Sequence, residues 1–96
     1  MAAKMILMFS VKPEKREEFI ELANSVLPDT RSYEGNLKVD VWIPEDDDGQ
    51  VWIYEEWESK EHQEKYFQWR LDTGLMDAIG PFLTADPRIA WLVDRN

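Results

Sequence analysis

The chain of 96 residues carries eleven basic and twenty acidic side chains, a formal net charge of −9 at pH 7. Such a field repels nucleic acid phosphates and anionic membrane surfaces, so both are excluded as partners. The absence of cysteine excludes disulfides, thiolate metal sites and cysteine nucleophiles. With 44% apolar and 32% charged residues, we expect one globular domain over residues 1–96.

The first predicted elements are a strand and a helix. Residues 4–11 form a nearly continuous apolar run, which predicts a buried strand. The run is too short for a signal peptide or a membrane span, so we expect a cytoplasmic protein. Pro13 suits the first turn of a helix, and apolar residues follow at helical spacing up to Leu27. We expect Pro28 to stop or kink this helix, and the sequence leaves open a further turn through Arg31.

Two strands joined by a hairpin loop come next. Residues 37–43 alternate apolar and polar side chains, which is typical of a strand. The acidic loop at 44–49 lacks the spacing of a calcium-binding loop, so we interpret it as a solvated turn. The strand at 50–57 carries large apolar groups on both faces. Helices can cover only one of them, so we expect a second copy of the chain to cover Trp42, Trp52 and Tyr54 on the other.

The last third of the chain predicts two helices and a strand. Ser59 is a suitable N-cap for a helix with His62, Tyr66 and Trp69 on one face. A short helix should end at Gly80, and residues 88–93 predict a final strand. The order β-α-β-β-α-β predicts an α+β, ferredoxin-like fold: a four-stranded antiparallel sheet with both helical segments on one face.

Three stretches carry a resemblance to a known family. They are Lys-Pro-Glu-Lys-Arg-Glu-Glu-Phe at 12–19, Thr-Arg at 30–31 with Gly35 four residues on, and Tyr-Glu-Glu-Trp-Glu-Ser at 54–59. In these stretches the chain resembles the antibiotic biosynthesis monooxygenase family, including its quinol monooxygenases. The resemblance extends over nearly the whole chain. It implies a dimeric α/β barrel, a homodimer formed through the sheet faces, and a small-molecule pocket between sheet and helices.

Two departures from the family bear on the chemistry. Many members carry a histidine in the second helix about nine residues after the strand tryptophan; here that residue is Tyr66, and the single histidine, His62, lies one turn earlier. Heme-degrading members use an asparagine of the first strand, where this chain offers Ile6, Leu7 and Met8. Because the chain also has no cysteine and no glycine-rich phosphate loop, we expect no heme, flavin or metal.

The candidate site combines one strand face with one helix face. Glu55 and Trp57 are two residues apart, His62 and Tyr66 are four apart, and a short connection separates the pairs, so we expect these four to line one cavity. The candidate catalytic residues are His62, Glu55 and Tyr66, with His62 or Glu55 as the base. The candidate substrate-binding residues are Trp57, Trp69, Arg31, Val39 and Val41.

Each assignment has a structural alternative. His62 can be a partly exposed packing residue, Glu55 can form a buried ion pair with Arg31, and both tryptophans can be plain core. For function, the resemblance implies a cofactor-independent monooxygenase that oxidises a small aromatic, phenolic or quinol-type substrate with O2. The alternatives are a non-catalytic ligand-binding or stress-associated dimer, and an isomerase of a polar metabolite. An aromatic-lined cavity favours the first, and several inward charges favour the last.

Overall fold

The computed structural model describes residues 2–96. These residues form four strands, three α-helices and two short 3-10 turns. In chain order these are β1 (Ala3–Ser10), η1 (Pro13–Lys15), α1 (Arg16–Ser32), β2 (Asn36–Trp42), β3 (Gln50–Trp57), α2 (Lys60–Asp72), α3 (Leu75–Ile79), η2 (Gly80–Phe82) and β4 (Arg88–Leu92).

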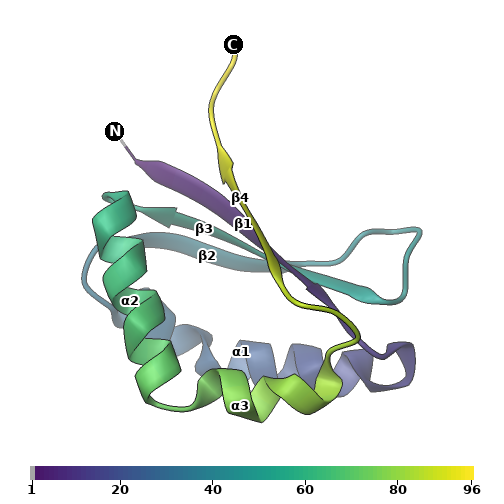
Figure 1. The fold of residues 1–96 in the computed structure, drawn as a ribbon. Coiled ribbons are helices and arrows are strands. Elements are labelled where there is room, and N and C mark those ends of the chain that lie inside the picture. Colours follow the sequence, from purple (N-terminus) through teal and green to yellow (C-terminus); the bar gives the residue numbers. More distant parts are fainter. Residues whose placement is uncertain (1) are drawn as a thin grey trace.

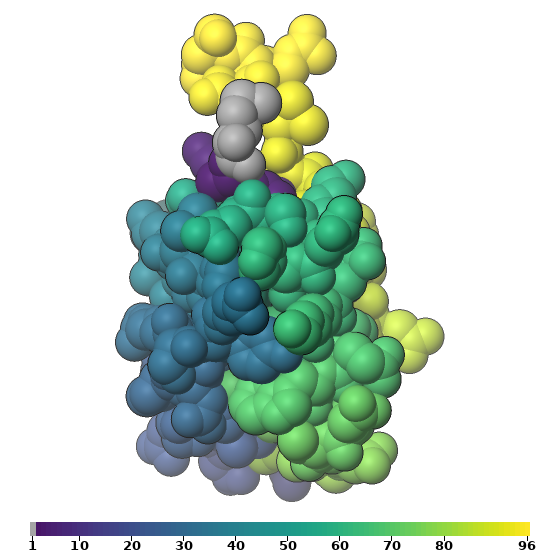
Figure 2. Space-filling view, turned by 90° about the vertical axis from the view of Figure 1, so that its left-hand side faces the viewer, coloured from purple at the N-terminus to yellow at the C-terminus, as the bar shows by residue number. Residues whose placement is uncertain are grey.

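The strands form one antiparallel sheet in the order β2-β3-β1-β4. All three helices lie on the same face of it, as Figure 1 shows. This arrangement confirms the predicted α+β, ferredoxin-like fold. The last residues of the chain stand clear of the sheet and the helices (Figures 1 and 2). No helix among residues 2–96 combines the length and the apolar character needed to cross a membrane.

The core lies between the sheet and the helices. Alternate residues of each strand point toward the helices, because side chains alternate along a strand with period two. Phe9 of β1 packs on Phe19 of α1 with ring centroids 5.1 Å apart, and Phe19 also meets Phe82 at 5.8 Å. The buried core cluster consists of Met5, Leu7, Phe9, Val11, Phe19, Val51 and Ile79.

Helix α1 does not stop at Pro28, where the sequence predicted a stop or a kink, and the further turn left open through Arg31 is helical. It continues without a break to Ser32. A proline inside a helix removes one backbone hydrogen bond, but packing on both sides of it offsets that loss, since Leu27 and Thr30 are both buried. The continued helix brings Thr30 into the interior of the fold.

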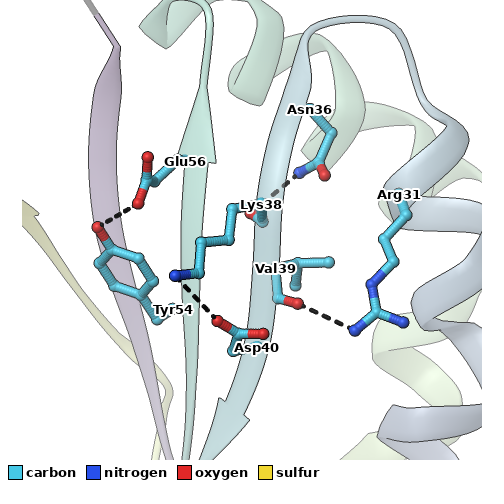
Figure 3. A network of polar contacts seen from close by, with 7 residues as sticks. All are labelled: Arg31, Asn36, Lys38, Val39, Asp40, Tyr54 and Glu56. Atoms are coloured by element: carbon cyan, nitrogen blue, oxygen red, sulfur yellow. Dashed lines mark hydrogen bonds and ion pairs between the residues drawn. The ribbon is translucent and has the colours of Figure 1, made fainter.

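No helix of the described residues lies on the opposite face of the sheet. Trp42 is 57% exposed, and Trp52 and Tyr54 are half-buried on the same face. Polar side chains surround these rings: Tyr54 donates a hydrogen bond to Glu56 (2.9 Å), and Lys38 lies 3.6 Å from Asp40 (Figure 3). A concavity of about 530 Å³ is formed there by Ile6, Lys38, Asp40, Trp42, Ile43, Trp52 and Tyr54.

Candidate active site

A cavity of about 60 Å³ lies between the sheet and the helices. Most of its wall is apolar, with side chains from β1, β2, β3 and all three helices. Five polar side chains interrupt this apolar wall, and each of these residues has less than a tenth of its surface exposed. The five are Thr30, Glu55, Gln63, Tyr66 and Arg70.

Glu55 is the only carboxylate among the cavity-lining residues. Its position in β3 turns it toward the helices, and only 4% of the residue is exposed. One carboxylate oxygen accepts a hydrogen bond from Trp57 Nε1 at 2.8 Å. Burial raises the pKa of Glu55 to about 7, although the Trp57 hydrogen bond and the positive charge of Arg70 act to lower it. A carboxylate with this pKa can both accept and return a proton near neutral pH.

This raised pKa predicts how Glu55 affects stability. The pKa of Glu55 is about 7 in the folded protein, against the usual 4.5. At a pH between these two values, the folded protein holds a proton at Glu55 that the unfolded chain has released. The contribution of Glu55 to the free energy of unfolding is therefore fully present below 4.5 and lost as the pH rises to about 7. With 1.36 kcal/mol per pKa unit, the loss is about 3 kcal/mol.

The variant Glu55→Gln has no such titration. Urea unfolding of both proteins at acidic and alkaline pH is expected to show the variant gaining about 3 kcal/mol relative to wild type as the pH rises. The contributions of the other titrating groups to the free energy of unfolding are the same in both proteins, so they cancel in the difference. A difference that stays constant with pH would contradict the raised pKa of Glu55.

Tyr66 and Arg70 form a buried hydrogen-bonded network with Thr30. The hydroxyl of Tyr66 lies 2.7 Å from Thr30 Oγ1, and Arg70 Nε donates to the same hydroxyl at 2.7 Å. Arg70 Nη2 also donates to Thr30 Oγ1 at 3.0 Å and to the carbonyl of Val26 at 2.9 Å. Burial raises the pKa of Tyr66, and the hydrogen bonds of Thr30 and Arg70 act to lower it. The network joins α1 to α2 and fixes the hydroxyl of Tyr66 at the cavity wall.

Three further aromatic rings lie beside this network. Trp57 is fully buried, and its ring centroid lies 5.0 Å from that of Tyr66. The ring centroid of Tyr33 lies 5.3 Å from that of Tyr66, and the ring centroid of Trp69 lies 5.4 Å from that of Tyr33. The guanidinium of Arg70 sits over the Trp69 ring at 4.6 Å. These contacts restrict the rotamers of Tyr66 and Arg70, since each is held on two sides.

The structure brings some of the predicted site residues together. Glu55, Tyr66 and Val39 line the cavity. Trp57 does not line it but lies behind it, in contact with the first two of these. Trp69 lies on the far side of Tyr66 and is half-buried.

Arg31 and Val41 lie elsewhere. Both line a surface groove of about 450 Å³ between α1 and β2. Arg31 is exposed, and its Nη2 donates a hydrogen bond to the carbonyl of Val39 at 3.2 Å, as Figure 3 shows. It therefore binds a backbone carbonyl of the edge strand β2. No ion pair with Glu55 is found within residues 2–96, and the interpretation of these two residues as a buried pair is wrong.

The expectation that His62 shares the cavity is also wrong. His62 borders a separate surface depression formed with Glu34, Glu61 and Lys65. Ser59 caps α2 by accepting the backbone N–H of His62 at 3.2 Å, and its hydroxyl also lies 2.7 Å from His62 Nδ1. The ring rests against Gly35, where an added Cβ would collide with it. The buried stripe of α2 is instead Gln63, Tyr66 and Arg70, so His62 falls one residue outside it.

Three residues of the site were missed from the sequence. Thr30 was assigned to the end of a helix interrupted by Pro28. Arg70 and Gln63 are of types that are mostly exposed in proteins, and the sequence indicates nothing else about either alone. A usable signal was the spacing of Tyr66 and Arg70, because residues four apart in a helix share a face.

Comparison with known proteins identifies the family. The family model described as antibiotic biosynthesis monooxygenase matches residues 3–70. The chain belongs to this family. The resemblance inferred from the strand end at 54–59 is therefore confirmed.

Solved structures of other proteins have the same fold. A conserved protein of Methanosarcina mazei has a TM-score of 0.86 at 20% identity, with 99% of this chain and 94% of that chain covered. A monooxygenase from the gene ActVA-Orf6 of Streptomyces coelicolor, in complex with the ligand nanaomycin D, has a TM-score of 0.80 at 22% identity, with 99% and 88% covered. At these identities the likeness extends to the fold alone.

A provisionally named heme-binding protein of Natronomonas pharaonis is 30% identical over 64 residues. The match covers 67% of this chain but only 11% of that protein, so this chain corresponds to a small part of it.

Proposed function

We propose that this protein is a cofactor-independent monooxygenase that oxidises a small phenol or hydroquinone with O2 in the cavity beside Glu55. The observation that carries the proposal is a buried carboxylate with a pKa of about 7 in a largely apolar cavity that also holds hydrogen-bond donors. The chain's membership of a family of monooxygenases agrees with it. The apolar wall favours an aromatic substrate over a phosphorylated sugar, and so over an isomerase of a polar metabolite.

Glu55 acts as the base in this proposal. It takes the proton of the substrate hydroxyl, and the resulting phenolate is electron-rich enough to pass one electron to O2. Recombination of the two radicals forms a new C–O bond, Glu55 returns its proton to the peroxide oxygen, and loss of water with the ring hydrogen leaves the quinone. In total, a phenol with an unsubstituted para carbon and one O2 give one quinone and one water. The apolar wall keeps bulk water away from the radical pair.

The size of the cavity sets a requirement on substrate entry. A cavity that admits benzene has a volume of about 150 Å³, whereas this one has about 60 Å³. There is room for water or O2, so an aromatic ring enters only when lining side chains move. We propose that Phe67 and Met76 do so, since Met76 is unbranched and lies on the short helix α3, which begins after Gly74 with a φ of +82°.

Heme does not fit this site. The cavity has a volume of about 60 Å³, whereas typical small-molecule and cofactor pockets have about 300–1,000 Å³. The single histidine of the chain lies outside the cavity, so it cannot supply an axial ligand there. The heme-binding name of the Natronomonas pharaonis relative is therefore not extended to this chain, and no step of the mechanism uses a heme.

We also propose that the protein is a homodimer through the outer face of its sheet. A two-fold axis brings the same patch of both copies together. The patch holds the exposed ring of Trp42, the half-buried rings of Trp52 and Tyr54, and charges of both signs, with Lys38 next to Asp40, so each copy offers partners for the charges of the other. Exposed apolar patches of this kind mark interaction surfaces.

Oxygen-electrode measurements test the proposed activity. Metal-free protein is screened against a panel of hydroquinones and polycyclic phenols, and O2 consumption that depends on both protein and substrate is expected. Tight binding of these compounds without O2 consumption would contradict the proposal and favour the non-catalytic ligand-binding dimer.

A further inference from the structure

Arg70 is a buried cation without a counter-ion in contact. Only 6% of the residue is exposed. No aspartate or glutamate oxygen of residues 2–96 lies within 4.0 Å of its guanidinium. A buried charge is costly unless it is paired, and removal of its partner is strongly destabilising. An arginine held in this way calls for an anion that the chain itself does not supply by contact.

The donors of Arg70 can be accounted for individually. The guanidinium has five N–H groups. Three of them go to neutral oxygens, those of the Tyr66 hydroxyl, the Thr30 hydroxyl and the Val26 carbonyl. The two N–H groups of Nη1 make no hydrogen bond with residues 2–96. The hydrogen bonds of Nε and Nη2 thus fix the orientation of the guanidinium, and the two N–H groups of Nη1 are free to bind a ligand.

Gln63 presents a second unused polar group. It is 5% exposed, and its side-chain amide makes no hydrogen bond within residues 2–96. No fully enclosed side-chain nitrogen or oxygen in this part of the chain lacks a partner. The unbonded atoms of Gln63 and Arg70 therefore border accessible space, and both residues line the cavity that contains Glu55.

We infer that Arg70 is the anion-binding residue of this site and that the ligands it selects are acidic phenols or enols, bound with the ionised oxygen facing Arg70. This inference rests on the proposed function and deepens it. The substrate proton goes to the Glu55 carboxylate, and the negative charge moves from Glu55 to the substrate oxygen. The total charge of Glu55, substrate and Arg70 does not change. The charge moves toward a fixed cation, which favours ionisation of the substrate.

Thr30 and Tyr66 have a positioning role in this arrangement. Both accept hydrogen bonds from the guanidinium, and neither can neutralise it. Arg31 has no such role, because it is exposed and bonded to the edge of the sheet.

The test uses binding of two probes that need no turnover. The first is para-nitrophenol, whose ionised form is yellow, and the second is para-nitroanisole, which has a similar shape but no acidic proton. Wild type is expected to bind the yellow anion and to prefer it to the anisole. Arg70→Met should weaken nitrophenolate binding by about 10–100-fold, as expected for loss of charge-assisted hydrogen bonds. Binding of the anisole should change little.

Two further variants complete the design. Arg31→Gln is the matched control and should bind both probes as wild type does. Arg70→Lys keeps the charge but loses the planar fork, so its preference for the anion should be intermediate. If Arg70→Met does not fold, by circular dichroism, the comparison of Arg70→Lys with wild type decides the question.

Three results would overturn the inference: no preference of wild type for the anion, binding of para-nitrophenol in its colourless protonated form, or an unchanged ratio of affinities in the Arg70 variants. Failure of the proposed function is distinguishable from these. An Arg70-dependent preference for the anion without O2 consumption would remove the monooxygenase activity and leave the anion-binding role of Arg70 intact.

Discussion

Replacing Glu55 by glutamine is expected to lower the rate of O2 consumption with a phenol by about 10²–10⁴-fold, the usual contribution of a positioned base. The amide has nearly the same shape as the carboxyl, but it cannot take the substrate proton. It can still accept the hydrogen bond that Trp57 donates to this side chain at 2.8 Å, so the fold should survive. Steady-state rates on the oxygen electrode, with circular dichroism as the check on folding, measure the effect.

The pH dependence of the wild-type rate gives a second readout of the same group. Glu55 is active only when ionised, and its pKa is about 7, so the rate should rise with pH and level off above this value. In the glutamine variant the residual rate should lack this rise.

Two control variants make the interpretation sharper. Glu58→Gln removes an exposed carboxylate near His62, and His62→Gln removes the single histidine, which borders a surface depression outside the cavity. Both should retain most of the activity. A loss in His62→Gln as large as that in Glu55→Gln would make the histidine the base after all and would contradict the site described above.

The second large effect is expected at the outer face of the sheet. Trp52→Glu should convert the dimer into a monomer, because each copy would bury an unpaired carboxylate in the interface. Such a charge costs about 3–5 kcal/mol, which weakens association by at least about a hundredfold. Sedimentation at micromolar concentration measures the change.

The matched control is Leu71→Glu, which adds the same charge at a 43% exposed leucine on α2. It should leave the dimer intact, since α2 lies on the other side of the sheet (Figure 1). A monomeric wild type would remove the proposed interface altogether.

Much of the fold could be predicted because the alternation of side chains along a strand shows which residues share a face. The period-two alternation over residues 50–57 placed Glu55 and Trp57 on one face and Trp52 and Tyr54 on the other, and the pairing of β3 with its neighbours agrees. A single residue can thus be assigned to a face from sequence parity alone.

The helical half of the site was harder to predict. Residues 62 and 66 are four apart, yet only Tyr66 reaches the cavity, since the buried stripe of α2 runs through residues 63, 66 and 70. The rotation of a helix about its axis depends on its packing, and the polar composition of α2 gave little indication of it. The N-cap of α2 also affects the position of His62, because the hydroxyl of Ser59 contacts the His62 ring and holds it at the surface.

The position of Arg70 depends on long-range contacts. Its hydrogen bonds reach Val26 and Thr30 on α1, more than forty residues away in the first case. The prediction that α1 would stop or kink at Pro28 left Thr30 outside the core. Without that buried hydroxyl, no local pattern indicates that an arginine near the end of α2 faces inward.

Isotope labelling tests the central claim most directly. Metal-free protein is incubated with a naphthol that has a free para carbon, in the presence of dioxygen labelled with a heavy oxygen isotope. The proposed mechanism predicts a naphthoquinone that carries one labelled oxygen atom, with the other labelled atom in water, and little product with Glu55→Gln. Unlabelled product with release of hydrogen peroxide, or no O2 consumption with any phenol tested, would contradict it.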